Sequence, residues 1–219
     1  SGFDYSALEE TLGARTAKGI IPSGLYVNSL KYRETAKNIS PYKNSDPSAL
    51  FRKGLRQLDL SAAELTVLCS EENEGAVRKI MQSWQASLGI DCAVFVEAVS
   101  ESELLKRVAA KNYQIALTDI SFHTDTAFNA LYAFTKGNAA NIISYSSKAY
   151  DSLVDSVKAA DNMTETVSAM EKCEEHLISA AAIIPLYEKA VYYGLAKGVS
   201  GIYGCHCGDI VYFRNTLSK

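Results

Sequence analysis

The stretch from residue 64 to residue 120 constrains the fold of this chain most, because short apolar runs alternate there with segments of helical periodicity. The runs cover residues 65–69, 92–99 and 113–117 and are rich in aliphatic and β-branched side chains. Such runs are typical of strands that are covered on both faces, and the helical segments between them supply the cover. The pattern predicts a βαβαβ unit with parallel strands and right-handed crossovers, hence an α/β fold.

Both helices of this unit have recognisable ends. The first is expected to begin after Asn73, a possible N-cap, and to stop before Gly89, where a left-handed residue is needed. The second is expected to begin at Ser100, which is spaced to form a capping box with Glu103. The apolar positions are Val77, Ile80, Met81, Trp84 and Leu88 in the first helix, and Leu104, Leu105 and Val108 in the second. Trp84 is thus assigned to packing and not to a ligand platform.

Composition excludes several classes of protein. The 219 residues are 47% hydrophobic, which is enough for a sizeable core. Lys and Arg number 22 against 25 Asp and Glu, without a basic block, so no nucleic-acid partner is expected. No apolar run reaches the roughly 18 residues of a membrane span. Residues 1–20 also lack a secretion signal. The chain is therefore expected to be either cytosolic or a trimmed piece of an exported protein.

The cysteines do not form a disulfide framework, because there are five of them and their spacing is irregular. Cys69 and Cys92 fall in the predicted strands and are expected to be small buried hydrophobes. The run Cys205, His206 and Cys207 could ligate a soft metal or haem, although structural zinc sites use Cys-x-x-Cys pairs and a second pair is missing. A surface loop or a local disulfide is the alternative interpretation.

The remainder of the chain divides unevenly. Residues 1–63 are largely irregular, with a short helix at 7–13, and such a stretch typically drapes over a surface or packs against something outside the chain. Helices are predicted at residues 48–58, 126–134, 147–160 and 164–179, and strands at 182–187 and 191–195. The helix at 48–58 carries Leu50, Phe51, Leu55 and Leu58, and Asn162 with Glu165 caps the last helix. His176 on that helix is expected to be solvated or to pack.

Motifs of catalysis are missing from the sequence. There is no Gly-x-Ser-x-Gly elbow, no phosphate-binding glycine loop and no His-Glu-x-x-His helix. We therefore expect neither an enzyme with catalytic residues nor a cofactor.

The order of several segments resembles the carboxyl-terminal lobe of the family 5 extracellular solute-binding proteins, which bind oligopeptides and dipeptides for ABC importers. The segments that carry the resemblance are residues 19–22, 64–90, 113–117, 141–153, 183–187 and 199–201. The resemblance covers nearly the whole chain. It implies a periplasmic-binding-protein-like lobe of type II, with a mixed sheet, a βαβαβ core and flanking helices.

The resemblance also implies a function and partners. Residues 1–219 would form one lobe, with residues 1–63 on the hinge side, and the amino-terminal lobe and lipoprotein signal would lie outside this chain. The ligand would be a peptide or similar small polar molecule, held between the lobes through its backbone and released to the transmembrane permease subunits. The location would be the extracellular face of the membrane, by lipid anchoring, or the periplasm.

The carboxyl ends of the predicted strands place the ligand site in the loop after residue 117. The family loop reads Gly-Trp-x-x-Asp; here Asp119 stands for the Gly, Ile120 for the Trp and His123 for the Asp. The expected ligand-binding residues are Thr118, Asp119, Ile120, Ser121, Phe122, His123, Asp125 and Tyr203. Asp119 and Asp125 are alternatively loop or helix-capping acids, and Phe122 and His123 alternatively pack at the sheet edge. A second function stays open, a carrier of a nickel chelate or haem that uses His123, Cys205, His206 and Cys207.

Overall fold

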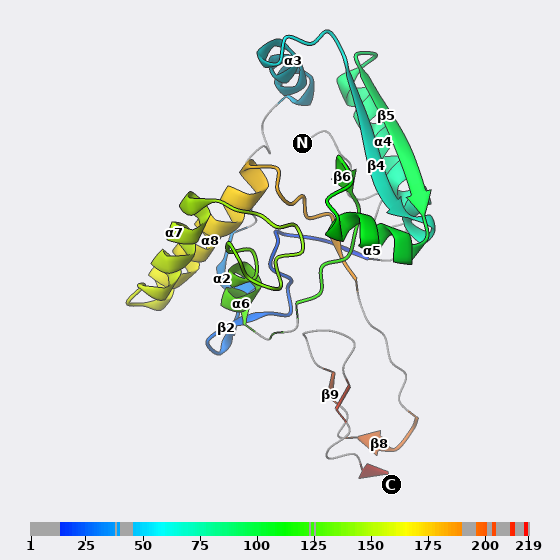
Figure 1. Ribbon diagram of the computed structural model, residues 1–219. Helices are drawn as coiled ribbons and strands as arrows, with labels where there is room; N and C mark the ends of the chain where they lie inside the picture. The colour runs from blue at the N-terminus through cyan, green and yellow to red at the C-terminus, as the bar shows by residue number, and fades with distance from the viewer. Residues whose placement is uncertain are drawn as a thin grey trace. The chain divides into compact units, whose positions relative to one another are not determined.

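The computed structural model describes residues 14–37, 39, 46–122, 124, 126–189, 196–200, 203–204, 211–212 and 217–218. They fall into two compact units. The described residues of unit 1 lie at 14 and within 41–119, and those of unit 2 lie within 15–40 and 120–219. Figure 1 labels helices and strands from both units.

Unit 1 is built on a parallel sheet of three strands. These are β4 (Ala63–Ser70), β5 (Cys92–Val99) and β6 (Ile115–Ala116), in the order β5-β4-β6. The crossovers contain α4 (Glu74–Leu88) and α5 (Glu101–Ala109), as Figure 1 shows. The predicted βαβαβ unit is therefore confirmed, although the third strand pairs over two residues and not over the five expected.

The alternation of side chains along β4 explains why both faces of this sheet are covered. Val67 and Cys69 point to one face and pack with Val77 of α4. Leu68 points to the other face and packs with Leu104 and Val108 of α5. The partly buried Trp84 and the buried Cys92 join the α4 side, which confirms the expectation of packing for both, and Cys69 and Cys92 are free thiols.

One predicted helix end and one predicted apolar position of these two helices need correction. Asn73 does not cap α4 with its side chain, because the short helix η1 (Glu71–Asn73) precedes α4; its amide donates to Ser70 Oγ at 3.0 Å. Gly89 does end α4, with a φ of 81°. Ser100 caps α5 as predicted, since its Oγ accepts from the Glu103 amide at 3.4 Å. Leu105, placed on the apolar face by its spacing, is 54% exposed.

The helix expected at 48–58 is α3 (Pro47–Gln57), which Asp46 caps by accepting from Ser48 N. Leu55 is buried, and Phe51 packs against the core on the α4 side of the sheet. Leu50 and Leu58 are instead exposed. Of the four apolar residues expected to face the core, only Phe51 and Leu55 are covered. The apolar face of α3 is therefore wider than the surface that the helix buries.

Among its described residues, unit 2 has three longer helices after the predicted ligand loop. They are α6 (Ala127–Tyr132), α7 (Lys148–Lys158) and α8 (Met163–Ser179), close to the predicted bounds. Their N-caps are Thr126, Ser147 and Asn162, and each accepts from the amide three residues on. The buried apolar residues of these helices include Ala130, Leu131, Tyr150, Val154, Met170, Cys173 and Leu177.

The stretch from Arg15 to Thr35 belongs to the core of unit 2. Its regular structure is sparse: β1 (Arg15–Thr16), β2 (Tyr26–Val27), β3 (Leu30–Lys31) and α2 (Tyr32–Thr35). Nevertheless Ile20, Ile21, Leu25, Val27 and Tyr32 are buried in the same cluster as α6, α7 and α8. The expectation that this stretch drapes over a surface is therefore wrong, because its irregular backbone carries core side chains.

Other short strands complete unit 2. Of the strand predicted at 182–187, only Tyr187 falls within a strand, β7 (Tyr187–Glu188), which runs antiparallel to β1; Leu186 O accepts from Ala17 N beside it at 3.2 Å. The pairs β8–β11 (Val199–Ser200 with Leu217–Ser218) and β9–β10 (Tyr203–Gly204 with Val211–Tyr212) follow. The helix predicted at 7–13 and the strand at 191–195 lie outside the described residues. Among the described helices, none has both the length and the apolar character that crossing a bilayer requires.

Candidate functional site

The predicted ligand loop leaves unit 1 at the carboxyl end of β6. Leu117 N donates to Leu68 O at 2.8 Å, so the chain still follows β4 one residue beyond the strand. Thr118 is half-buried and Asp119 is exposed. These two residues therefore end unit 1 at the sheet edge where parallel α/β folds bind ligands.

The next residues of the loop belong to unit 2. Ser121 is exposed, whereas Ile120 and Phe122 pack against the core of that unit. The Phe122 ring meets Phe134 edge-on, with centroids 6.1 Å apart and an interplanar angle of 84°. Phe122 thus takes the packing role that the sequence left as an alternative, and it anchors the exposed Ser121 beside it.

Hydrogen bonds fix the end of the loop. Thr126 N donates to Thr124 Oγ1 at 3.2 Å, and Asn129 Nδ2 donates to the same oxygen at 3.2 Å. Thr126 Oγ1 caps α6 by accepting from Asn129 N at 3.4 Å. Thr126 also forms a parallel bridge with Tyr26, which joins the loop to the buried stretch before α2.

His123, Asp125, Cys205, His206 and Cys207 lie outside the described residues. Tyr203 is placed only by its backbone, in β9. Within the described part of the chain, no three His, Cys, Asp or Glu side chains gather as a metal site.

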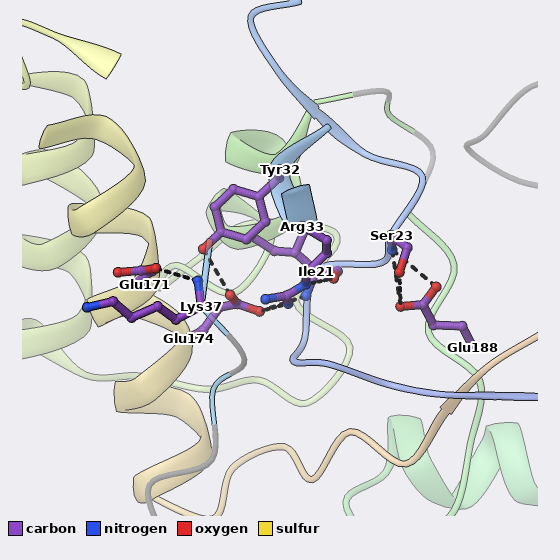
Figure 2. A network of polar contacts seen from close by, with 8 residues as sticks. All are labelled: Ile21, Ser23, Tyr32, Arg33, Lys37, Glu171, Glu174 and Glu188. Atoms are coloured by element: carbon purple, nitrogen blue, oxygen red, sulfur yellow. Dashed lines mark hydrogen bonds and ion pairs between the residues drawn. The ribbon is translucent and has the colours of Figure 1, made fainter. Parts of the chain in front are cut away.

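The structure also contains a polar cluster that the sequence did not predict, centred on Glu174 of α8. Its carboxylate is completely buried. Oε1 accepts from Ile21 N at 2.9 Å and from Arg33 Nη2, and Oε2 accepts from Tyr32 Oη at 3.0 Å (Figure 2). Arg33 Nε donates to Ile21 O at 2.8 Å, so the guanidinium bridges the carboxylate and the backbone. We call Ile21, Tyr32, Arg33 and Glu174 the Glu174 cluster.

The electrostatics of the Glu174 cluster follow from its burial. Arg33 and Glu174 form an ion pair whose side chains are 3% and 0% exposed. Burial, and next the Glu174 carboxylate, raise the pKa of the Tyr32 phenol, so Tyr32 remains a neutral donor. Arg33 Nη1 is buried without a partner among the described residues.

Two further carboxylates hold the same stretch of chain. Glu188 of β7 accepts from Ser23 Oγ at 2.9 Å and from Ser23 N at 3.1 Å. Glu171, one turn before Glu174, accepts from Lys37 N at 2.7 Å (Figure 2). Carboxylates of α8 and β7 therefore supply hydrogen bonds that the irregular backbone does not supply itself.

Sequence periodicity contained a signal for Glu174. It follows Met170 by four residues and precedes Leu177 by three, so it lies on the apolar face of the helix. Because Lys172 and Glu175 nearby are also charged, the local sequence is equally consistent with a solvated run of charges.

His176 was expected either to be solvated or to pack, and in the structure it packs against two tyrosine rings. Its Nε2 lies 3.0 Å from Tyr145 Oη and 3.4 Å from Ser147 Oγ, and its ring contacts those of Tyr145 and Tyr150. Ser147 Oγ already accepts from Tyr150 N as the N-cap of α7. This serine and histidine therefore contribute to the packing of α7 on α8.

Comparisons with known proteins agree with this geometry. No protein-family model matches the chain. The dipeptide-binding protein DppE of Bacillus subtilis (strain 168) is 29% identical over 161 residues, which cover 71% of this chain and 29% of that protein. Among solved structures, the peptide-binding pheromone receptor PrgZ matches 100% of this chain and 43% of its own, with a TM-score of 0.75 and 18% identity. The substrate-binding domain of an oligopeptide ABC transporter from Bacillus anthracis str. Ames matches 100% of this chain and 44% of its own, with a TM-score of 0.78 and 17% identity.

These matches define the fold. It is the α/β fold of the type II periplasmic-binding-protein class, and the resemblance to the peptide-binding proteins of ABC transporters is confirmed. The chain spans less than half the length of each of the three proteins, with 29%, 43% and 44% covered. Those proteins are described as binding proteins, a receptor and a transporter domain, not as enzymes or metal carriers.

Proposed function

We propose that this chain is a ligand-binding lobe, residues 1–219, of the substrate-binding component of a peptide-type ABC importer. One observation carries the proposal: peptide-binding proteins match the fold along 100% of the chain, with TM-scores of 0.75 and 0.78. The 29% identity to DppE supports the same conclusion from the sequence. The ligand is a peptide, and it leaves the protein chemically unchanged.

The whole protein in this proposal works outside the membrane, at the extracellular face by a lipid anchor or in the periplasm. An amino-terminal lobe of the same protein supplies the opposite wall of the cleft, and the permease subunits receive the peptide. A single wall encloses its ligand incompletely, so the lobe alone binds peptides weakly.

The proposed contacts lie in the loop after β6. Thr118, Asp119 and Ser121 present polar groups there, and Thr118 is the half-buried member of the three. The Asp119 carboxylate is the proposed partner of the peptide α-ammonium, and backbone groups bond the extended peptide. Ile120 and Phe122 anchor the loop from the core side. His123, Asp125 and Tyr203 complete the proposed set.

Ligand-observed NMR on the chain tests the class of ligand. Pools of dipeptides, tripeptides and longer peptides should show saturation transfer, whereas the same amino acids unlinked, nickel chelates and haem should not. Transfer from a metal chelate or haem with none from peptides would replace this proposal by the metal-carrier alternative.

The role of Asp119 has its own test. Asp119→Asn should weaken peptides with a free amino terminus by up to about fivefold, the range of an exposed ion pair, and should leave N-acetylated peptides unaffected. The matched control is Asp91→Asn, an exposed acid directly before β5 at the opposite edge of the sheet. An equal loss for acetylated peptides would assign Asp119 a different role.

A further inference from the structure

Glu174 has no part in the proposed ligand contacts, yet a whole stretch of chain is folded around it. Its three donors, Ile21 N, Tyr32 Oη and Arg33 Nη2, all lie within residues 21–33. The regular structure of that stretch is limited to two-residue strands and the first half of a four-residue helix. The backbone there has few hydrogen bonds of its own. Carboxylates fix much of its course: Glu174 through three donors, and Glu188 through Ser23.

Stability alone does not explain the buried ion pair. Desolvation of two charges offsets most of their attraction, and apolar residues of similar volume in place of such a pair are often neutral or stabilising. Arg33 Nη1 is also buried without a partner in the described chain, which adds a further cost. What the pair does supply is directionality, because hydrogen bonds depend on angle and the carboxylate accepts from three donors of residues 21–33 at once.

That arrangement extends to the predicted ligand loop. Tyr26, in the middle of the stretch, bridges Thr126. Thr126 caps α6 through Asn129 N and donates its own amide to Thr124, which lies within the loop. One stretch and one bridge therefore connect the carboxylate on α8 to Thr124.

We propose that Glu174 and Arg33 are positioning residues for the predicted ligand loop. They fix residues 21–33, and these residues hold Thr126 and Thr124 in place. The relevance to a peptide rests on the proposed function, whereas the positioning itself does not.

Amide hydrogen exchange of the whole chain tests the positioning. Arg33→Met combined with Glu174→Met removes both charges while keeping apolar bulk, so no unpaired charge stays buried. The amides of Thr124, Thr126 and Asn129 should then exchange about tenfold faster or more, while those of β4 and β5 stay unchanged. Unchanged protection at these three residues, or an equal rise at every amide of unit 2, would overturn the proposal.

A milder variant covers the case in which the double variant does not fold. Tyr32→Phe removes one donor to Glu174 and keeps the buried ring, and it should raise exchange at the same amides by roughly threefold.

The control that matches the double variant is Glu74→Met with Arg78→Met. It removes an exposed ion pair on α4 in unit 1 and should not affect exchange at Thr124.

Peptide titrations separate the two proposals. If the unchanged chain binds no peptide, the proposed function fails, and the exchange data still decide the positioning. If it does bind, the variant with faster exchange at Thr124 should bind several-fold more weakly. Equal affinity with a loosened loop would contradict positioning of the ligand contacts.

Discussion

At the residue scale, Gly19 shows how closely the backbone approaches the Glu174 cluster. A Cβ built there would collide with the Arg33 guanidinium and lie 2.6 Å from Glu174 Oε1. Both groups are buried and paired, so neither has room to move. Glycine at this position is therefore required for space.

Gly19→Ala should lower the free energy of unfolding by about 1–3 kcal/mol, the usual cost of overpacking. Gly54→Ala is the matched control, because nothing lies within 4 Å of its Cβ and it sits inside α3, where alanine is favoured. Urea unfolding of both variants gives the comparison. A Gly19→Ala variant as stable as the unchanged chain would show that the cluster yields easily.

The buried cysteines give a second prediction at this scale. Burial, and next the Glu174 carboxylate, raise the pKa of the Cys173 thiol to about 12, and burial raises those of Cys69 and Cys92. The thiolate is the reactive form, so at pH 8 Cys173 should alkylate roughly a thousandfold more slowly than an ordinary thiol. Peptide mapping after iodoacetamide treatment measures this, with the urea-unfolded chain as control.

The same shift has a stability consequence. The pKa of Cys173 in the folded chain is raised above that of an unfolded thiol, so the folded state holds this proton more tightly. The resulting contribution to the free energy of unfolding is complete below the unfolded pKa of about 8.5 and is lost as the pH rises toward 12. Stability should therefore fall between these values. Fast alkylation of folded Cys173 at pH 8 would contradict its burial.

At the element scale, local capping determines where the helices begin. Asn162 Oδ1 accepts from Glu165 N at 3.0 Å, and Asn162 Nδ2 donates to Glu165 Oε1 at 2.8 Å. The Glu165 carboxylate also accepts from Asp161 N at 3.2 Å. This cap opens α8, the helix that carries Glu174.

Asn162→Ala should therefore lower the free energy of unfolding by about 1 kcal/mol, the typical cost of a lost N-cap. Asn112→Ala is the control, since only backbone atoms of that exposed residue form hydrogen bonds within the described chain. Thermal unfolding followed by circular dichroism measures both. Equal effects of the two substitutions would refute the capping role.

The features predicted correctly from the sequence depend on residues that are close to one another along the chain. The βαβαβ order and the caps at Ser100 and Asn162 depend on residues a few positions apart. Only the last residue of the strand expected at 182–187 falls within a strand, because its partner, Arg15–Thr16, is remote in sequence and only two residues long. The Glu174 cluster escaped prediction for the same reason, as its members lie 141 to 153 positions from Glu174.

The candidate site likewise has one part that the sequence predicts and one part that depends on contacts between residues distant in sequence. Topology alone placed Thr118 and Asp119 after the third strand, because the carboxyl ends of parallel strands share one edge. Whether Phe122 packs in the core depends on Phe134, which lies in the turn after α6. That choice required tertiary contacts that no local pattern contains.

At the scale of the whole molecule, the chain has the fold of peptide-binding proteins over its full length and covers less than half of theirs. We propose that it forms one wall of a peptide site, and that the ligand loop begins at the carboxyl end of β6. A single wall should bind weakly, with a dissociation constant on the order of 1 mM.

Chemical-shift mapping of the isotope-labelled chain, titrated with peptides to several times that concentration, tests this claim most directly. We expect saturable shifts concentrated at Thr118, Asp119, Ser121 and Thr124, with β5 and α7 unaffected. No saturable shift with peptides of any length, or shifts confined to regions away from this loop, would contradict it.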